Sequence, residues 1–167
     1  MKSFQSGKNR RLITGGVIAA LYVLLTLVSS AFGLSSGAVQ FRFSEMLCIL
    51  PCFNVCAIPG LFIGCVLANI ITGALLPDVI FGSLATLLGA AGTYLLRRNK
   101  YLAAASPVLA NIIIVPFVLI KAYMIESSYI YLVLTVGLGE IVSAGFFGLL
   151  LYDTVIKNKY LHDLISQ

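Results

Sequence analysis

The feature that most constrains this sequence is an apolar run of 23 residues, 12–34, that contains no charged side chain. As an α-helix this run is about 35 Å long, enough to cross the roughly 30 Å hydrocarbon layer of a membrane. Because basic residues precede it, a cleaved signal peptide is the rival interpretation. However, the apolar core of a signal peptide is only about 7–15 residues long, and further long apolar segments follow. We therefore interpret the run as a retained membrane helix.

The composition of the rest of the chain also indicates a membrane protein. Hydrophobic residues make up 60% of the chain and charged residues only 10%, whereas about 25% of a typical soluble domain is charged. Five further apolar segments follow the first, at residues 41–53, 55–76, 79–96, 101–120 and 130–151. The sequence therefore predicts an all-α integral membrane protein, multi-pass in the cell membrane.

The segment 41–53 is short for a membrane crossing, because its 13 residues cover about 20 Å as a helix, and Pro51 interrupts it. The distribution of basic residues decides how it is interpreted. If the segment crosses as a short, broken helix, nine of the eleven lysines and arginines lie on the cytoplasmic side, as the positive-inside rule requires: Lys2, Lys8, Arg10, Arg11, Arg97, Arg98, Lys100, Lys157 and Lys159.

This topology predicts six transmembrane helices with both termini in the cytoplasm. The predicted organisation is a basic cytoplasmic leader at 1–11, a six-helix membrane domain at 12–157 and a cytoplasmic tail at 158–167. The net charge of +5 then reflects topology, and nucleic acid is not a predicted partner.

The polar residues do not form a pattern typical of an enzyme or a metal site. Cys48, Cys52 and Cys56 follow one another at intervals of four, which places them on one helix face. Cys65 also lies in an apolar segment, and the single histidine, His162, is in the tail. Packing as small hydrophobes is the favoured interpretation of these cysteines, with metal binding or a disulfide as the alternative. We predict no catalytic residue, no metal and no cofactor in this chain.

Glu140 is the most informative single residue, because it lies near the middle of the segment 130–151. An ionisable side chain at the centre of a membrane helix costs about 2.5–3.5 kcal/mol on insertion scales and by default marks a functional site. Ser143 shares its helix face. The alternative is a structural ion pair or a protonated carboxyl bonded to a neighbouring helix.

Other polar residues lie in the outer half of the predicted bundle with Glu140. Each has a structural alternative: Arg42 and Glu45, three residues apart, can pair with each other, Asp78 can act as the N-cap of the helix 79–96, and asparagines can join helices. Together they predict an outward-facing cavity whose polar and aromatic lining includes Gln40, Phe41, Arg42, Phe43, Glu45, Asn69, Asp78, Asn111, Phe117 and Tyr123.

Small residues recur four apart in the first apolar run, as Gly15 with Ala19 and Gly16 with Ala20. Such pairs allow another helix to approach closely within a membrane. Packing inside the chain is one interpretation, and docking onto a partner subunit is the other.

Three motifs in the chain resemble the QueT family. They are QFRFSE at 40–45, IPGLFIGC at 58–65 followed by Ala68-Asn69, and DVIFGSLATLL at 78–88. This family comprises substrate-binding S components of energy-coupling factor (ECF) transporters, assigned to the uptake of queuosine precursors. The resemblance covers essentially the whole chain beyond the leader.

The resemblance implies a six-helix S component that captures its solute outside, under a lid formed by the loop after the first helix. It implies docking on a transmembrane coupling subunit, through Gly15, Gly16, Ala19 and Ala20. Two cytoplasmic ATPase subunits then use the ATP. The implied substrate is a 7-deazaguanine, such as the 7-aminomethyl or 7-cyano compound, or queuine.

Given such a substrate, we expect Glu140 to accept the two adjacent donors of the guanine-like edge. Asn111 or Gln40 donates to the ring carbonyl, and Phe41, Phe43 or Tyr123 stacks on the ring. Arg42 and Glu45 hold the lid shut, and Asp78 or Glu45 lies near a cationic aminomethyl group. Two alternatives stay open: an S component for another small vitamin-like solute, and a structural membrane protein whose polar residues only join helices.

Overall fold

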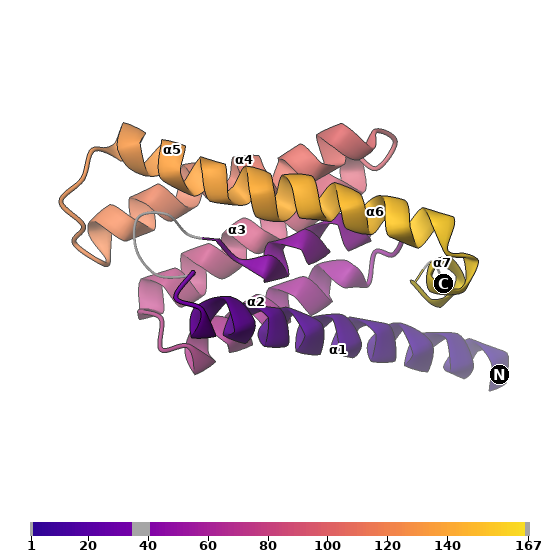
Figure 1. Cartoon of the computed structure of the whole chain (residues 1–167). Coiled ribbons are helices and arrows are strands. Elements are labelled where there is room, and N and C mark those ends of the chain that lie inside the picture. The colour runs from indigo at the N-terminus through magenta and orange to yellow at the C-terminus, as the bar shows by residue number, and fades with distance from the viewer. Residues whose placement is uncertain (1, 35–40, 166–167) are drawn as a thin grey trace.

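The computed structural model describes residues 2–34 and 41–165, with side chains from residue 9 onward. Every regular element within these ranges is helical (Figure 1). In chain order the elements are α1 (Lys2–Ala31), the 3₁₀-helix η1 (Phe43–Cys52), α2 (Ala57–Ile71), α3 (Leu76–Leu95), α4 (Lys100–Lys121), α5 (Tyr129–Glu140), the π-helix η2 (Ile141–Phe147), α6 (Gly148–Lys157) and α7 (Lys159–Ile165).

Four stretches in the described residues are long and apolar enough to cross a membrane: Asn9–Ala31, Leu76–Leu95, Lys100–Lys121 and Tyr129–Lys157. The last comprises α5, η2 and α6, which form one continuous rod in Figure 1. The predicted all-helical, multi-pass membrane protein is confirmed. The helices η1 and α2 are shorter apolar segments, so the count of six crossings stays a prediction.

The helix η1 lies inside the bundle, where it packs against α1, α2, α3, α4, α6 and η2. Leu47, Cys48, Ile49 and Leu50 are all buried. Long 3₁₀-helices are uncommon because their hydrogen-bond geometry is poor, so burial of these side chains stabilises the segment. The sequence predicted a short, Pro51-broken helix here, and the observed element is short and contains Pro51.

The helices α1 and α2 pack with their backbones unusually close. A Cβ atom built on Gly60 would lie 2.6 Å from the carbonyl oxygen of Gly15, and one on Gly64 would lie 2.9 Å from that of Ala19. Gly15 and Ala19 therefore serve packing inside the chain, the first of the two interpretations of the small-residue pairs. Gly16 and Ala20 are exposed on α1, so contact with a coupling subunit stays a prediction for them.

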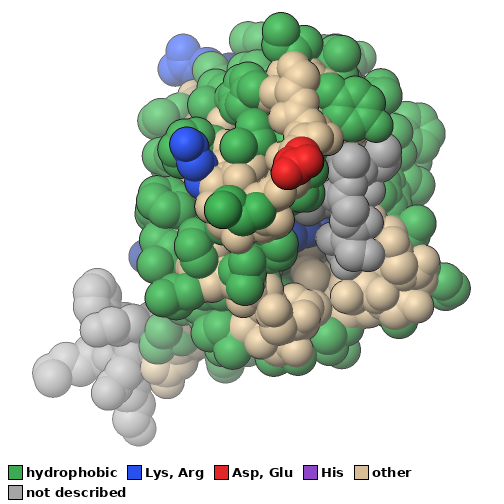
Figure 2. Space-filling model, turned by 90° about the vertical axis from the view of Figure 1, so that its left-hand side faces the viewer, with side chains coloured by type: hydrophobic (Ala, Val, Ile, Leu, Met, Phe, Trp, Pro, Cys, Tyr) green, Lys and Arg blue, Asp and Glu red, His purple; other side chains and the backbone are tan. Residues whose placement is uncertain are grey.

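The two described chain ends lie at the same end of the bundle (Figure 1). The start of α1, the connection from α3 to α4 and the connection from α6 to α7 meet there, bringing together the clusters of basic residues. We call this the basic end. At the opposite end, seen in Figure 2, few charged side chains lie among hydrophobic ones.

Candidate functional site

A polar cluster lies at the end of the bundle opposite the basic end. It consists of Arg42 before η1, Asn69 on α2, Asp78 on α3 and Tyr123 after α4, and we call it the Arg42 cluster. Nη1 of Arg42 donates to Oδ1 of Asn69 at 3.4 Å, and Nη2 lies 3.8 Å from Oδ2 of Asp78. The phenol of Tyr123 donates to the same Asp78 oxygen at 3.0 Å.

The structural alternatives given for Asp78 and Arg42 are wrong. Asp78 is not the N-cap of its helix, because α3 already begins at Leu76, and Pro77 in its first turn starts the helix with a fixed φ. Arg42 does not pair with Glu45, because Arg42 has an extended backbone outside η1 and its guanidinium pairs with Asp78. Gly82, one turn further along α3, leaves room for the Asp78 carboxylate, since a Cβ there would lie 2.8 Å from it.

Glu45 belongs to a second, deeper polar cluster. The phenol of Tyr22 on α1 donates to its Oε1, and the amide of Asn111 on α4 and the thiol of Cys48 donate to its Oε2 at 3.5 and 3.3 Å. Only 2% of the Glu45 side chain is exposed. Glu45 therefore ties η1 to α1 and α4, and the lid role expected for it is not supported by its contacts.

Glu140 is buried where α5 passes into the π-helix η2. Within the described part of the chain its Oε2 has no hydrogen-bond partner. It interacts electrostatically with Glu45 and Arg42 and through a side-chain hydrogen bond with Asn111, so it adjoins the cluster that contains Glu45. π-Helical segments occur frequently at functional sites. The hydroxyl of Ser143, in contrast, donates to the Gly139 carbonyl of its own helix at 2.7 Å.

Three buried polar atoms lack hydrogen-bond partners among the described residues: Nε of Arg42, Oγ of Ser83 and Oε2 of Glu140. Buried polar atoms are nearly always paired in folded proteins. Leaving one unpaired costs about 1–3 kcal/mol, and more for a charged group. A ligand with both donors and acceptors would satisfy such atoms.

Aromatic side chains lie beside the arginine. The ring centroids of Phe41 and Phe43 are 4.8 Å apart, and each lies 6.1 Å from that of Phe147 at the end of η2. Stacking of Phe41 or Phe43 on a ligand stays a prediction. Phe117 is 54% exposed and lines a separate small cavity with Phe81, so it does not join them.

Other predicted site residues are placed as follows. Asn69 and Asn111 are buried in the two clusters, whereas Gln40 lies outside the described residues. Cys48 and Cys65 are fully buried in the hydrophobic core, in agreement with a packing role. All four cysteines are free, and the described residues contain no group of three or more potential metal ligands.

The residues that hold η1 in place were not predicted from the sequence. Thr26 donates to Ser44 at 2.8 Å, and the Ser29 hydroxyl accepts from the Phe43 N–H at 2.8 Å. On α1, Tyr22, Thr26 and Ser29 follow one another at intervals of four and three residues, which is the spacing of one helix face. That spacing was the available signal, since a polar stripe on a membrane helix faces the protein interior.

Tyr123 offers a test of the Arg42 cluster. Its hydroxyl donates to Asp78 and accepts from the Leu75 N–H at 3.3 Å, and burial raises its pKa, so it stays a neutral donor at physiological pH. We expect Tyr123→Phe to lower the free energy of unfolding in detergent by about 1 kcal/mol. Tyr131→Phe is the control, because Tyr131 is 52% exposed. An equal loss in both variants would contradict the bonding described.

These features define a class of protein: a multi-pass helical membrane protein with a buried, partly unpaired polar site near one membrane surface. Such a site suits binding of a small polar solute.

Comparison with known proteins places the chain within that class. The family model described as QueT transporter matches residues 12–157, so the chain belongs to the QueT transporter family. It is a transporter family and not an enzyme family, which confirms that prediction. A relative, the queuosine precursor transporter QueT of Lactococcus lactis subsp. cremoris (strain MG1363), is 39% identical over 62 residues, which are 37% of this chain and 37% of the relative. No solved structure matches.

Proposed function

We propose that this chain is the substrate-binding S component of an ECF-type importer and that it captures a queuosine precursor. The observation that carries the proposal is the set of unpaired buried atoms of Arg42, Ser83 and Glu140 in a member of the QueT transporter family. The name of the Lactococcus relative supports the substrate class.

The chemistry of a 7-deazaguanine fits the groups around the Arg42 cluster. Its guanine-like edge presents two adjacent N–H donors, which the Glu140 carboxylate accepts, and a ring carbonyl that accepts from Nε of Arg42 or from Asn111. Carboxylates and arginines pair in this way with base edges. Phe41 or Phe43 stacks on the ring, which contributes about 1–3 kcal/mol per base in comparable sites. The Asp78 carboxylate balances a cationic aminomethyl group.

In the proposed topology η1 and α2 complete six membrane crossings, and the basic end faces the cytoplasm. Both termini are then cytoplasmic, and the Arg42 cluster opens to the outside. The exposed Gly16 and Ala20 face of α1 contacts a transmembrane coupling subunit, and two ATPase subunits bound to it hydrolyse ATP. This chain itself needs no cofactor.

Uptake measurements test the coupling. We expect cells that express this chain together with a coupling subunit and two ATPases to accumulate labelled 7-aminomethyl-7-deazaguanine, because the energy for transport comes from those subunits. Cells that express this chain alone should bind the compound without accumulating it. Accumulation by the chain alone, at the same expression level, would show that it is a self-sufficient carrier and would contradict the proposed coupling.

A further inference from the structure

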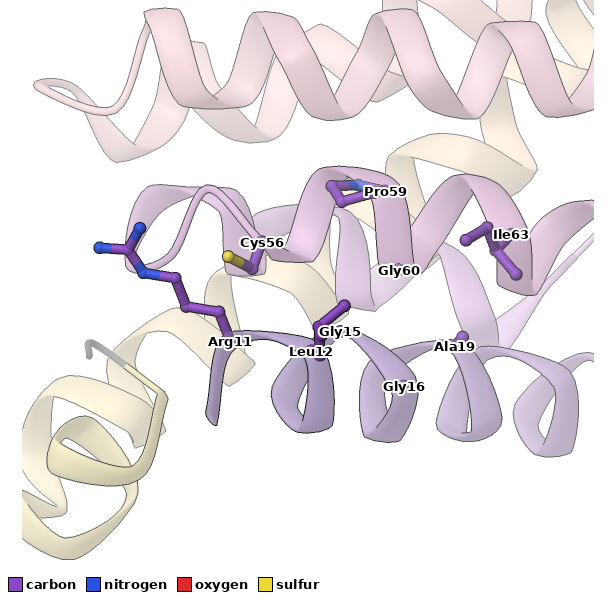
Figure 3. A pocket seen from close by; sticks show the side chains of 9 residues that line it. All are labelled: Arg11, Leu12, Gly15, Gly16, Ala19, Cys56, Pro59, Gly60 and Ile63. Carbon is purple, nitrogen blue, oxygen red and sulfur yellow. The ribbon is translucent and has the colours of Figure 1, made fainter. Parts of the chain in front are cut away.

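An apolar groove runs along the outer surface of the bundle between α1 and α2 (Figure 3). Its volume is about 400 Å³, and apart from Arg11 every residue that lines it is apolar, a glycine or a cysteine. Leu12 and Ile63 on its walls are 70% and 51% exposed. In a membrane this surface faces lipid or another protein. Figure 3 shows Arg11 at one end of the groove, and Ala19 with Ile63 at the other.

A second and more polar pocket adjoins the Arg11 end of the groove. It has a volume of about 320 Å³ and is lined by Arg97 and Tyr94 among others, and Arg11 lines both cavities. The guanidinium carbon of Arg97 lies 4.0 Å from the centroid of the Tyr94 ring, a cation–π contact that positions this side chain. Neither arginine forms a salt bridge with an acidic side chain in the described ranges.

We propose that the two cavities form one binding site for an anionic phospholipid, with an acyl chain in the groove and the phosphate between Arg11 and Arg97. The uncharged apolar run of α1 begins at Leu12, directly after Arg11, so Arg11 lies at the depth of the lipid headgroups. Guanidinium groups bind phosphate oxygens through paired hydrogen bonds.

The charges favour a lipid over a protein segment as the occupant. An apolar helix docked in the groove would fill it but leave the polar pocket empty and both guanidinium groups without an anion. An amphiphile with one anionic head and an apolar chain satisfies both cavities at once. This site is separate from the Arg42 cluster, at the other end of the bundle, and does not depend on which solute is transported. Because Gly16 lines the groove and also belongs to the face proposed for the coupling subunit, the lipid occupies the groove while the chain is not docked on that subunit.

Native mass spectrometry of the purified full chain tests the site, by titration with dioleoyl phosphatidylglycerol and with dioleoyl phosphatidylcholine. We expect the anionic lipid to bind more tightly. Arg11→Gln and Arg97→Gln should each weaken its binding about fivefold, as expected for the loss of one arginine near an anionic headgroup. The matched control is Arg98→Gln, because Arg98 is exposed next to Arg97 but lines neither cavity.

A second pair of variants tests the groove. Gly16 lines it, and a side chain there meets no described atom within 4 Å, so Gly16→Leu fills the groove without disturbing the α1–α2 packing. It should lower the occupancy of both lipids, whereas Ala20→Leu, on the same helix but outside the groove, should not. The proposed site would be overturned if Arg98→Gln weakened binding of the anionic lipid as much as Arg11→Gln or Arg97→Gln does. Unchanged lipid binding in Gly16→Leu would also overturn it. So would displacement of the lipid by soluble glycerol phosphate at the lipid's own concentration.

Discussion

Glu140→Gln is expected to weaken the binding of 7-aminomethyl-7-deazaguanine about 100-fold, equivalent to about 3 kcal/mol. A carboxylate can accept both adjacent donors of the base edge, whereas a glutamine side chain keeps one acceptor and turns its NH₂ group toward the other donor. The clash of two donors adds to the lost bond in a site where water cannot compensate. Calorimetric titration of wild type and variant measures the difference.

Glu126→Gln is the matched control for this prediction. Glu126 carries the same side chain and undergoes the same chemical change, but it is exposed in the connection between α4 and α5 and lies outside both polar clusters. We expect its replacement to leave affinity within twofold of wild type, because an exposed charge contributes about 0–1 kcal/mol. Unchanged affinity in Glu140→Gln would contradict recognition of the base edge by this carboxylate.

Gly60→Ala is expected to be the most disruptive of the conservative substitutions in the helix core. The added methyl group would lie 2.6 Å from the carbonyl oxygen of Gly15, and backbone on both sides cannot move away without separating α1 from α2. Overpacking of this kind costs about 1–3 kcal/mol. We expect a clearly lower thermal unfolding temperature, measured in detergent with a thiol-reactive dye that reports the exposure of buried Cys48 and Cys65.

Gly16→Ala is the control for Gly60→Ala, since it makes the same chemical change on the partner helix. No described heavy atom lies within 4 Å of the added methyl group, and alanine is favoured over glycine in a helix interior by about 1 kcal/mol. The control should unfold at the same or a slightly higher temperature. If both variants unfold at the wild-type temperature, the close contact between α1 and α2 is not important for stability.

The helical architecture could be predicted from the sequence because hydropathy depends on composition along the chain. Apolar runs long enough to cross a membrane identified α1, α3, α4 and the rod from Tyr129 to Lys157. Burial of Glu140 also followed, since a carboxylate at mid-segment cannot face lipid. The 3₁₀ form of η1 did not follow, because it depends on the packing of six surrounding elements.

The partners of the polar side chains were predicted less well than their burial. A pair between Arg42 and Glu45 was the structural alternative, because they are three residues apart, a local rule that holds within one helix. Arg42 lies outside η1 and meets Asp78 on α3, while Glu45 meets Tyr22 on α1. These are long-range contacts, which sequence spacing does not encode. Ser83 was not predicted as a site residue, because a serine in an apolar segment carries no distinctive pattern.

The most direct test of the Arg42 cluster as a solute site is calorimetric titration of the purified chain in detergent with four compounds. They are 7-aminomethyl-7-deazaguanine, 7-cyano-7-deazaguanine, queuine and guanine. We predict saturable, one-to-one binding of at least one deazapurine, tighter than that of guanine, because the family and the unpaired atoms of Arg42, Ser83 and Glu140 point to such a ligand. No heat of binding from any of the four compounds, with the protein folded, would contradict the proposed substrate class.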